Sequence, residues 1–580
     1  MSSTKYEPVK AEDELPPGSA ASNESSANMT PDSDLDDEED DLEGLEYEEG
    51  VELRDFDKLG ANGAGRSDPG EGAAGDSDSD EDHTPSSGRK RKRRSSTASF
   101  ELYTPDEERR VRRKLDTRLV LFVALLYLLS FLDRSNIGNA KVAGLMTDLN
   151  MSDNQFEWLL TAFYITYILF EWMTLCFKIF PPHIYIACCV CAWGVLASLQ
   201  ALATTWKYML VVRIFLGMGE AAFVGIPFYL SFFFRREELA FRVGLFIAAA
   251  PLATTFASSL AWGIVSLGNK TGIASWRLLF LVEGFPACVV AVWAWYWIPD
   301  SPGQARWLDA REKKIATLRM RKENAANTST EKSGGGGTVH STVPRHKRKF
   351  QWTEVVHALR DPKNYLSAGM FFCCNVAFSS MPVFLPSIVN GMGYSTMASQ
   401  GLSAPPFFFA FLVVLVTSFV SDRLQSRSIP MMFHGLLAMS GYLLATIAGA
   451  LQTGPTLRYL ATFPICAGFF SAVTIVITWT LNNQISDEGK GTGVAILQYI
   501  GQLGPLIGTR LYPDTHAPFY VAGNGVCAVA MAMVFVLALA LRIVLIRENA
   551  RRRARWKEGV GESLVGGGGI AKGGQFLYLT

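Results

Sequence analysis

The chain lacks the residue patterns on which enzyme chemistry depends. Its 580 residues include only seven histidines, and no histidine-rich segment has the spacing of a metal site. No nucleophile motif is present, and no glycine-rich phosphate loop follows a strand-like segment. We therefore expect neither an enzyme nor a bound cofactor.

The nine cysteines also have no arrangement that predicts a site. They lie in or beside apolar segments, so we expect buried thiols and no disulfide framework. Cys188, Cys189 and Cys191 lie close together, but no histidine or second cysteine pair at ligand spacing accompanies them, so no metal site is expected. The sequence opens on polar residues, unlike a secretory signal, and the first long apolar segment would therefore begin membrane entry.

Charged residues are rare in roughly twelve apolar segments of about 20 residues, a length that crosses a membrane as a helix. The segments come as six, a polar insert and six more, which is typical of a transporter built from two equivalent halves. The expected spans are 118–141, 156–179, 183–204, 208–233, 241–266, 277–298, 365–389, 401–421, 430–451, 457–481, 490–510 and 518–546. The sequence thus predicts an all-α membrane protein with twelve transmembrane helices in two six-helix halves.

Composition divides the rest of the chain into tails and a linker. An acidic run over 32–49 and a basic run over 89–94 have scarcely any apolar pattern between them, so the N-terminal tail is expected to be disordered. A charged segment around 306–322 is expected to form a surface helix. The predicted parts are a tail over 1–114, halves over 115–299 and 365–547, a linker over 300–364 and a tail over 548–580.

Basic residues predict the orientation in the membrane. They gather before the first span, between spans four and five, between spans eight and nine, and after the last span, so these segments are expected to be cytoplasmic. They are Arg109, Arg110, Arg112, Arg113, Lys114, Arg235, Arg236, Arg242, Arg423, Arg427 and the cations of 547–555. Twelve spans place both termini on this side.

Asn150 and Asn269, each in an Asn-x-Ser/Thr triplet, fall on the outer side of the membrane and are candidates for glycosylation.

Four charged residues lie where charge is costly. Asp133 and Arg134 fall in the first span, and Arg213 and Glu220 fall in the fourth. An unpaired charge at the bilayer centre costs about 3 kcal/mol on insertion scales, so such residues usually face a cavity and serve function. Two further buried acids, Glu171 and Glu283, are interpreted as structural.

The spacing of these charges suggests binding of an anion coupled to protons. Arg213 and Glu220 are seven residues apart, which places them on one helix face about 10 Å apart. Burial and a neighbouring arginine act oppositely on the proton affinity of a carboxylate, so an anion that takes the arginine links binding to protonation. Structural salt bridges are an equally open alternative.

The second half offers neutral polar residues instead. Some are candidates for the cavity, and the alternative is that they only join helices by hydrogen bonds. They are Asn375, Trp479, Asn482, Asn483, Gln484, Tyr499 and Gln502.

Several motifs occur together in order. The first span reads YLLSFLDRSNIGNA from Tyr127, the fourth reads RIFLGMGEA from Arg213, and the sixth opens WRLLFLVEG at Trp276 and closes on IPD at 298–300. Over residues 115–547 the chain resembles the anion:cation symporter branch of the major facilitator superfamily, and more narrowly the fungal allantoate permease group.

This resemblance implies alternating access through a central cavity and proton-driven uptake of small organic or sulfur-containing anions. Substrates of the group include allantoate, nicotinate, pantothenate, biotin and sulfur oxoanions. Matching the motifs assigns proton and substrate roles to Asp133, Arg134, Arg213 and Glu220, cavity positions to Tyr164 and Tyr167, and a gate to Asp422 and Arg423. The loop at 178–183 departs from the glycine-rich gating loop of the family.

The expected partners are therefore a small anion, protons and the lipid bilayer, with no nucleic acid, and the protein is expected to be a monomer. The plasma membrane is the expected location, and an internal membrane is the alternative. Efflux of a secondary metabolite and a nutrient sensor that signals through the long tail are the other functions left open.

Overall fold

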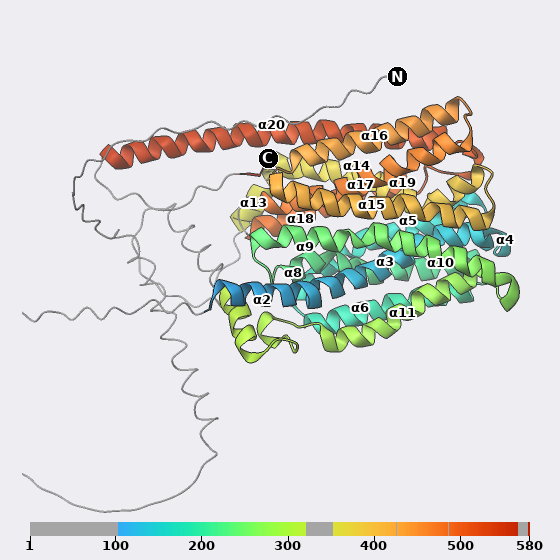
Figure 1. Ribbon diagram of the computed structural model, residues 1–580, viewed down its shortest axis with the longest axis horizontal. Coiled ribbons are helices and arrows are strands. Elements are labelled where there is room, and N and C mark those ends of the chain that lie inside the picture. The colour runs from blue at the N-terminus through green and yellow to red at the C-terminus, as the bar shows by residue number, and fades with distance from the viewer. Residues whose placement is uncertain (1–102, 321–351, 425, 485–486, 566–577, 580) are drawn as a thin grey trace, which may run out of the picture. The chain divides into compact units, whose positions relative to one another are not determined.

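The computed structural model describes residues 103–320, 352–424, 426–484, 487–565 and 578–579. All regular structure in these residues is helical, and the long helices run side by side (Figure 1). The predicted all-α fold class is confirmed. Residues 1–102, which hold most of the predicted disordered tail, lie outside the described part.

The first half of the bundle begins before its first predicted span. α2 continues almost without a break into α3, and α9 into α10. The helices are α2 (Pro105–Leu115), α3 (Leu121–Ala140), α4 (Met146–Asp148), α5 (Asp153–Phe170), α6 (Pro182–Leu199), α7 (Trp206–Ala221), α8 (Ile226–Leu230), α9 (Arg236–Ile247), α10 (Ala249–Thr271) and α11 (Ser275–Trp297).

The second half contains the longest helices. α14 runs through two internal prolines, Pro382 and Pro386, and α20 extends 45 residues. The helices are α13 (Trp352–Arg360), α14 (Pro362–Gly391), α15 (Thr396–Leu424), α16 (Ser428–Ala450), α17 (Pro455–Asn482), α18 (Asp487–Gly501), α19 (Gly504–Gly508) and α20 (Val521–Val565).

Each of the twelve predicted spans falls on helix. In the described residues ten helices are long and apolar enough to cross a membrane. The other two spans are the interrupted ones. Span 156–179 is α5 followed by a tighter 3-10 segment (Glu171–Lys178), and span 490–510 is α18 and α19, which are separated just before Gly504 and Pro505. A proline has no N–H to donate, so a new helix at Pro505 is locally favoured over a continuous one.

α2 differs from the prediction, because it is ordered helix where residues 105–114 were expected to belong to the disordered tail. Thr104 and Glu107 form a capping box, in which each side chain accepts from the backbone N–H of the other. Acidic residues in the first turn and basic residues in the last turn complement the helix dipole. The linker also begins and ends in helix, over residues 310–320 and in α13.

α2, α13 and the last turns of α20 lie at one end of the bundle, here called the linker end, and α4 lies at the opposite end (Figure 1). At the opposite end the two halves meet closely. Thr161 and Thr509 share a hydrogen bond of 3.1 Å, and Lys141 and Asp514 form an ion pair of 2.8 Å. Gly138 of α3 packs on the backbone of α14, where any Cβ would clash with the carbonyl oxygen of Val383.

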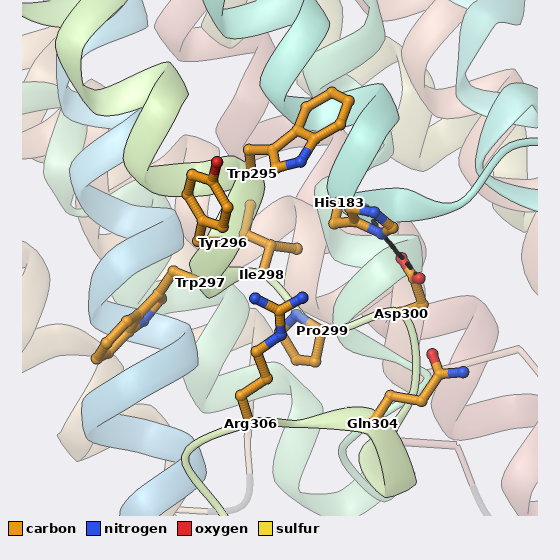
Figure 2. Close-up of a pocket in the computed structure, with 9 residues that line it drawn as sticks. All are labelled: His183, Trp295, Tyr296, Trp297, Ile298, Pro299, Asp300, Gln304 and Arg306. Carbon is orange, nitrogen blue, oxygen red and sulfur yellow. Dashed lines mark hydrogen bonds and ion pairs between the residues drawn. The ribbon is translucent and has the colours of Figure 1, made fainter.

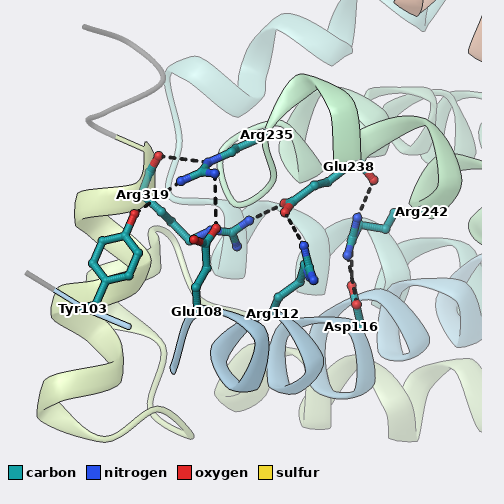
Figure 3. A network of polar contacts seen from close by, with 8 residues as sticks. All are labelled: Tyr103, Glu108, Arg112, Asp116, Arg235, Glu238, Arg242 and Arg319. Carbon is teal, nitrogen blue, oxygen red and sulfur yellow. Dashed lines mark hydrogen bonds and ion pairs between the residues drawn. The ribbon is translucent and has the colours of Figure 1, made fainter. Parts of the chain in front are cut away.

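The linker end of the first half is held by a network of ion pairs (Figure 3). Arg319 and Arg112 both bind Glu238, the latter at 3.1 Å, and Arg235 binds Glu108 at 3.2 Å. Burial alone would raise the pKa of Glu238, but the nearby guanidinium groups of Arg319 and Arg112 outweigh it and hold that pKa below its usual range. The network joins α2, α9 and residues 310–320, so several cations used to predict orientation also have structural partners.

Candidate functional site

Two of the four predicted site residues form an ion pair in the interior. Arg134 Nη2 of α3 lies 2.8 Å from Glu220 Oε2 of α7, and Arg134 Nε donates to the same oxygen at 3.3 Å. The hydroxyl of Ser130, one turn before Arg134, also donates to Glu220 Oε2, at 3.2 Å. Glu220 is fully buried. One carboxylate oxygen therefore receives three hydrogen bonds from α3.

Aromatic rings surround the guanidinium of Arg134. The centre of the Tyr167 ring lies 4.7 Å from it, that of Phe163 5.3 Å and that of Phe131 5.9 Å. The predicted cavity residues Tyr164 and Tyr167 are both buried in α5. A cation against several ring faces is stabilised electrostatically, so the aromatic residues hold Arg134 in place beside Glu220.

The other two predicted residues stay unpaired. Within the described part of the chain, Asp133 Oδ2 has no hydrogen-bond partner, and neither do Nε and Nη2 of Arg213. Arg213 is 1% exposed and lies over the Phe280 ring at 5.9 Å. Asp133 interacts electrostatically with Arg213 and Glu220 without forming an ion pair with either. The four residues thus form one pair and two separate, buried charges.

Glu283 joins this group, although the sequence interpretation assigned it a structural role. It is 3% exposed on α11, one turn from Phe280, and interacts electrostatically with Asp133. Neither of its carboxylate oxygens has a partner among the described residues. The sequence signal that could have identified it is a charged residue within an apolar span, which usually serves a function.

Glu171 is the other buried acid, and its surroundings differ. It lies at the start of the 3-10 segment, 4% exposed, and both oxygens lack partners in the residues that the structure describes. Glu171 interacts electrostatically with Tyr167, and among the described residues it shows no such interaction with Asp133.

The predicted polar residues of the second half have fixed partners or face outward. Asn375 of α14 donates to the carbonyl of Gly501 at 3.1 Å, and Gln484 donates to Asn364 at 2.6 Å. Trp479 and Asn483 bind the backbone of Leu579. Tyr499 is 44% exposed. None of these contacts brings the five residues to Arg134 or Arg213.

The remaining predicted positions lie at the ends of helices. Asp422 forms an ion pair with Arg427, whose Nη1 also donates to Ser421 at 2.8 Å, while Arg423 lies over the Phe419 ring at 5.2 Å. Asn150 is exposed between α4 and α5. The Asn269 side chain lies outside the described part.

A surface pocket lies apart from these residues, where α6 begins and α11 ends (Figure 2). Its volume is about 260 Å³. His183 Nδ1 lies 2.8 Å from both carboxylate oxygens of Asp300, and Figure 2 shows Arg306 extending toward Pro299. The pocket contains none of the four predicted site residues.

Comparison with known proteins matches the chain to one family of membrane transporters. The model of a family described as the Major Facilitator Superfamily matches residues 123–509. The MFS-type transporter cnsO of Penicillium expansum is 30% identical over 462 residues, which cover 78% of this chain and 86% of that protein. A high-affinity nicotinic acid transporter of Saccharomyces cerevisiae is 26% identical, covering 77% of this chain and 80% of that one.

Solved structures show the same fold. The proton:xylose symporter XylE, bound to 6-bromo-6-deoxy-D-glucose, superimposes with a TM-score of 0.56 at 14% identity. The match covers 73% of this chain and 95% of that chain. At this identity the likeness is one of fold.

Proposed function

Because the chain belongs to the major facilitator superfamily, and is thus a membrane transporter and not an enzyme, we propose that it carries a small anion together with protons. The proposed substrates are organic carboxylates such as nicotinate, allantoate or pantothenate, and sulfur oxoanions. Uptake across the plasma membrane, with both termini in the cytoplasm, is the proposed direction. The motifs around Asp133 and Arg213 and the similarity to a nicotinic acid transporter support a place in the anion:cation symporter branch, near the allantoate permeases.

The observation that carries this proposal is the unequal pairing of the two arginines. Arg134 is already bound to Glu220, whereas Arg213 has two nitrogens without a partner in the described residues. A buried charge is costly until an opposite charge compensates it. The planar guanidinium of Arg213 matches a carboxylate or oxoanion, so the substrate would supply the missing partner.

The charge balance explains why protons would accompany the anion. Asp133, Glu220 and Glu283 contribute three negative charges when ionised, and Arg134 and Arg213 two positive charges, which gives a sum of −1. Binding of a monoanion would then leave −2 in a buried group. Two protons bound to the carboxylates change the sum of the empty site to +1, and a monoanion makes it zero. Anion and protons therefore favour each other's binding.

Close contacts between the halves at the end opposite the linker end support alternating access. Thr161–Thr509, Lys141–Asp514 and the contact of Gly138 with Val383 join the halves at the opposite end. We assign this end to the outside and the linker end to the cytoplasmic side. Transport then requires these contacts to separate.

Uptake by reconstituted vesicles tests the proposal. The full chain in proteoliposomes should accumulate labelled nicotinate, or another anion of a panel of carboxylates and sulfur oxoanions, when a proton gradient is imposed. A protonophore should abolish the accumulation. Failure of every anion in the panel would overturn the substrate class, and accumulation that ignores the protonophore would overturn the coupling. Sided vesicles distinguish uptake from efflux.

A further inference from the structure

The last described residues of the chain return to the second half and bind there as a peptide. Asn549 of α20 accepts a hydrogen bond from the N–H of Tyr578 and donates one to its carbonyl oxygen, both at 2.9 Å. A single amide side chain thus satisfies both backbone groups of one residue. This is the pairing that a neighbouring strand would otherwise provide.

A second asparagine repeats the pattern at the next residue. Asn483, just after α17, accepts from the N–H of Leu579 at 2.8 Å and donates to its carbonyl oxygen at 3.1 Å. The indole of Trp479 donates to the same carbonyl at 2.8 Å. Two consecutive residues are therefore held through their backbones by side chains of two different helices.

The side chain of Tyr578 is recognised as well. Its hydroxyl oxygen accepts from Lys363 Nζ of α14 at 3.1 Å and from Arg552 Nη2 of α20 at 2.8 Å. The two cations also lie 4.3 and 4.5 Å from the ring centre. Tyr578 is 6% exposed. These contacts select an aromatic side chain with a hydroxyl group at this position.

The length of the chain allows this return. α20 continues for 16 residues beyond Asn549, a distance of about 24 Å along the helix axis. Twelve residues join Val565 to Tyr578, and an extended chain of that length reaches roughly 40 Å. This reach exceeds the distance of about 24 Å between Asn549 and the end of α20, so the number of residues permits the return.

We propose that Lys363, Trp479, Asn483, Asn549 and Arg552 form a peptide-binding site whose ligand is the chain's own Tyr578-Leu579 segment. The bound segment connects the end of α17 to α14 and α20. α17 also contacts the other half, because Gly244 of α9 packs on Thr474. Assuming the proposed transport function, bracing the end of α17 slows the movement of the halves, so the segment acts as an inhibitory brake.

Binding is tested directly with a chain that ends at residue 577 and a labelled peptide of residues 572–580. The purified truncated chain should bind the peptide, and a peptide with Tyr578→Ala should bind at least about tenfold more weakly, as the loss of roughly 1.4 kcal/mol implies. Binding requires no transported substrate, so this result is independent of the proposed function. Equal binding of the two peptides, or binding of neither, would overturn the site.

Inhibition is tested by transport and by hydrogen exchange. The truncated chain should take up substrate about fivefold faster or more, the added peptide should restore the slow rate, and the amides at 479–484 should lose protection. Asn549→Asp, which keeps the acceptor but removes the donor, should act like a partial truncation. Asn150→Asp, at an exposed asparagine at the opposite end of the bundle, is the control and should leave the rate unchanged. An unchanged or lower rate in the truncated chain would overturn the brake.

Discussion

Two groups of predicted polar residues, one in each half of the bundle, differ in how their buried atoms are satisfied. In the first half Asp133, Arg213 and Glu283 keep charged atoms without partners among the described residues. In the second half Asn375 and Gln484 use their amides for hydrogen bonds to neighbouring helices. A neutral, satisfied amide fixes a helix, whereas an unsatisfied buried charge is costly until a ligand or a proton compensates it. We infer that the first half carries the chemistry and the second half provides its frame.

Replacement of Arg134 should have the largest effect. Arg134→Ala leaves Glu220 buried without its cation, a loss of about 3–5 kcal/mol for a buried pair. Initial uptake in proteoliposomes should therefore fall by about 100-fold or more. Thermal unfolding of the purified variant controls for loss of fold. Uptake above half of the original rate in a folded variant would contradict the role of the pair.

Replacement of Glu220 should separate binding from coupling. Glu220→Gln keeps the shape and can still accept from Ser130 and Arg134, but it removes one titrating group. Gradient-driven accumulation should be lost, while exchange of labelled for unlabelled substrate across the membrane should continue. If accumulation keeps its original dependence on the pH gradient, Glu220 does not carry a coupled proton.

Glu283 and Glu171 provide a matched pair. Both are buried and unpartnered in the described residues, but only Glu283 interacts with Asp133. Glu283→Gln should shift the pH dependence of uptake, with a rate loss of about tenfold, whereas Glu171→Gln should leave the pH profile unchanged. Equal pH profiles for the two variants would show that the interaction with Asp133 does not set the pH dependence of uptake.

Asn375 should give the smallest effect on transport. Asn375→Ala removes one hydrogen bond to the carbonyl of Gly501, which should lower the free energy of unfolding by about 1 kcal/mol. Uptake should stay within about twofold of the original rate. A loss of uptake as large as that of Arg134→Ala would break the comparison between the halves.

The helical fold was predictable because a membrane allows little else. Backbone groups in hydrocarbon must be satisfied within a helix, so apolar length alone predicted twelve spans that all fall on helix. The start of α2 could not be located from apolar length, because the segment is rich in charged residues and its helix signal is a capping motif of two residues. Thr104 and Glu107 form a capping box within a charged segment that reads as disordered by charge content.

The burial of Asp133, Arg134, Arg213 and Glu220 in apolar helices was also predictable, whereas their role as site residues stays a prediction. Their pairing was not. Spacing along α7 relates Arg213 to Glu220, but it contains no information on which residue of α3 faces them, and the partner of Glu220 is Arg134. In the same way, no local pattern shows that Asn483 binds a residue 96 positions later in the chain.

The prolines of α14 have a mechanical consequence. Pro382 and Pro386 lack the N–H groups that would donate to residues 378 and 382, so two helix hydrogen bonds are missing near Val383, one that would end just before it and one that would span it. Val383 is also where Gly138 lets the halves approach backbone to backbone. Flexing α14 at this weak stretch would part the halves at their tightest point while the remainder of the helix stays straight. Separation of the halves at this end would then need a local hinge and no sliding of whole helices.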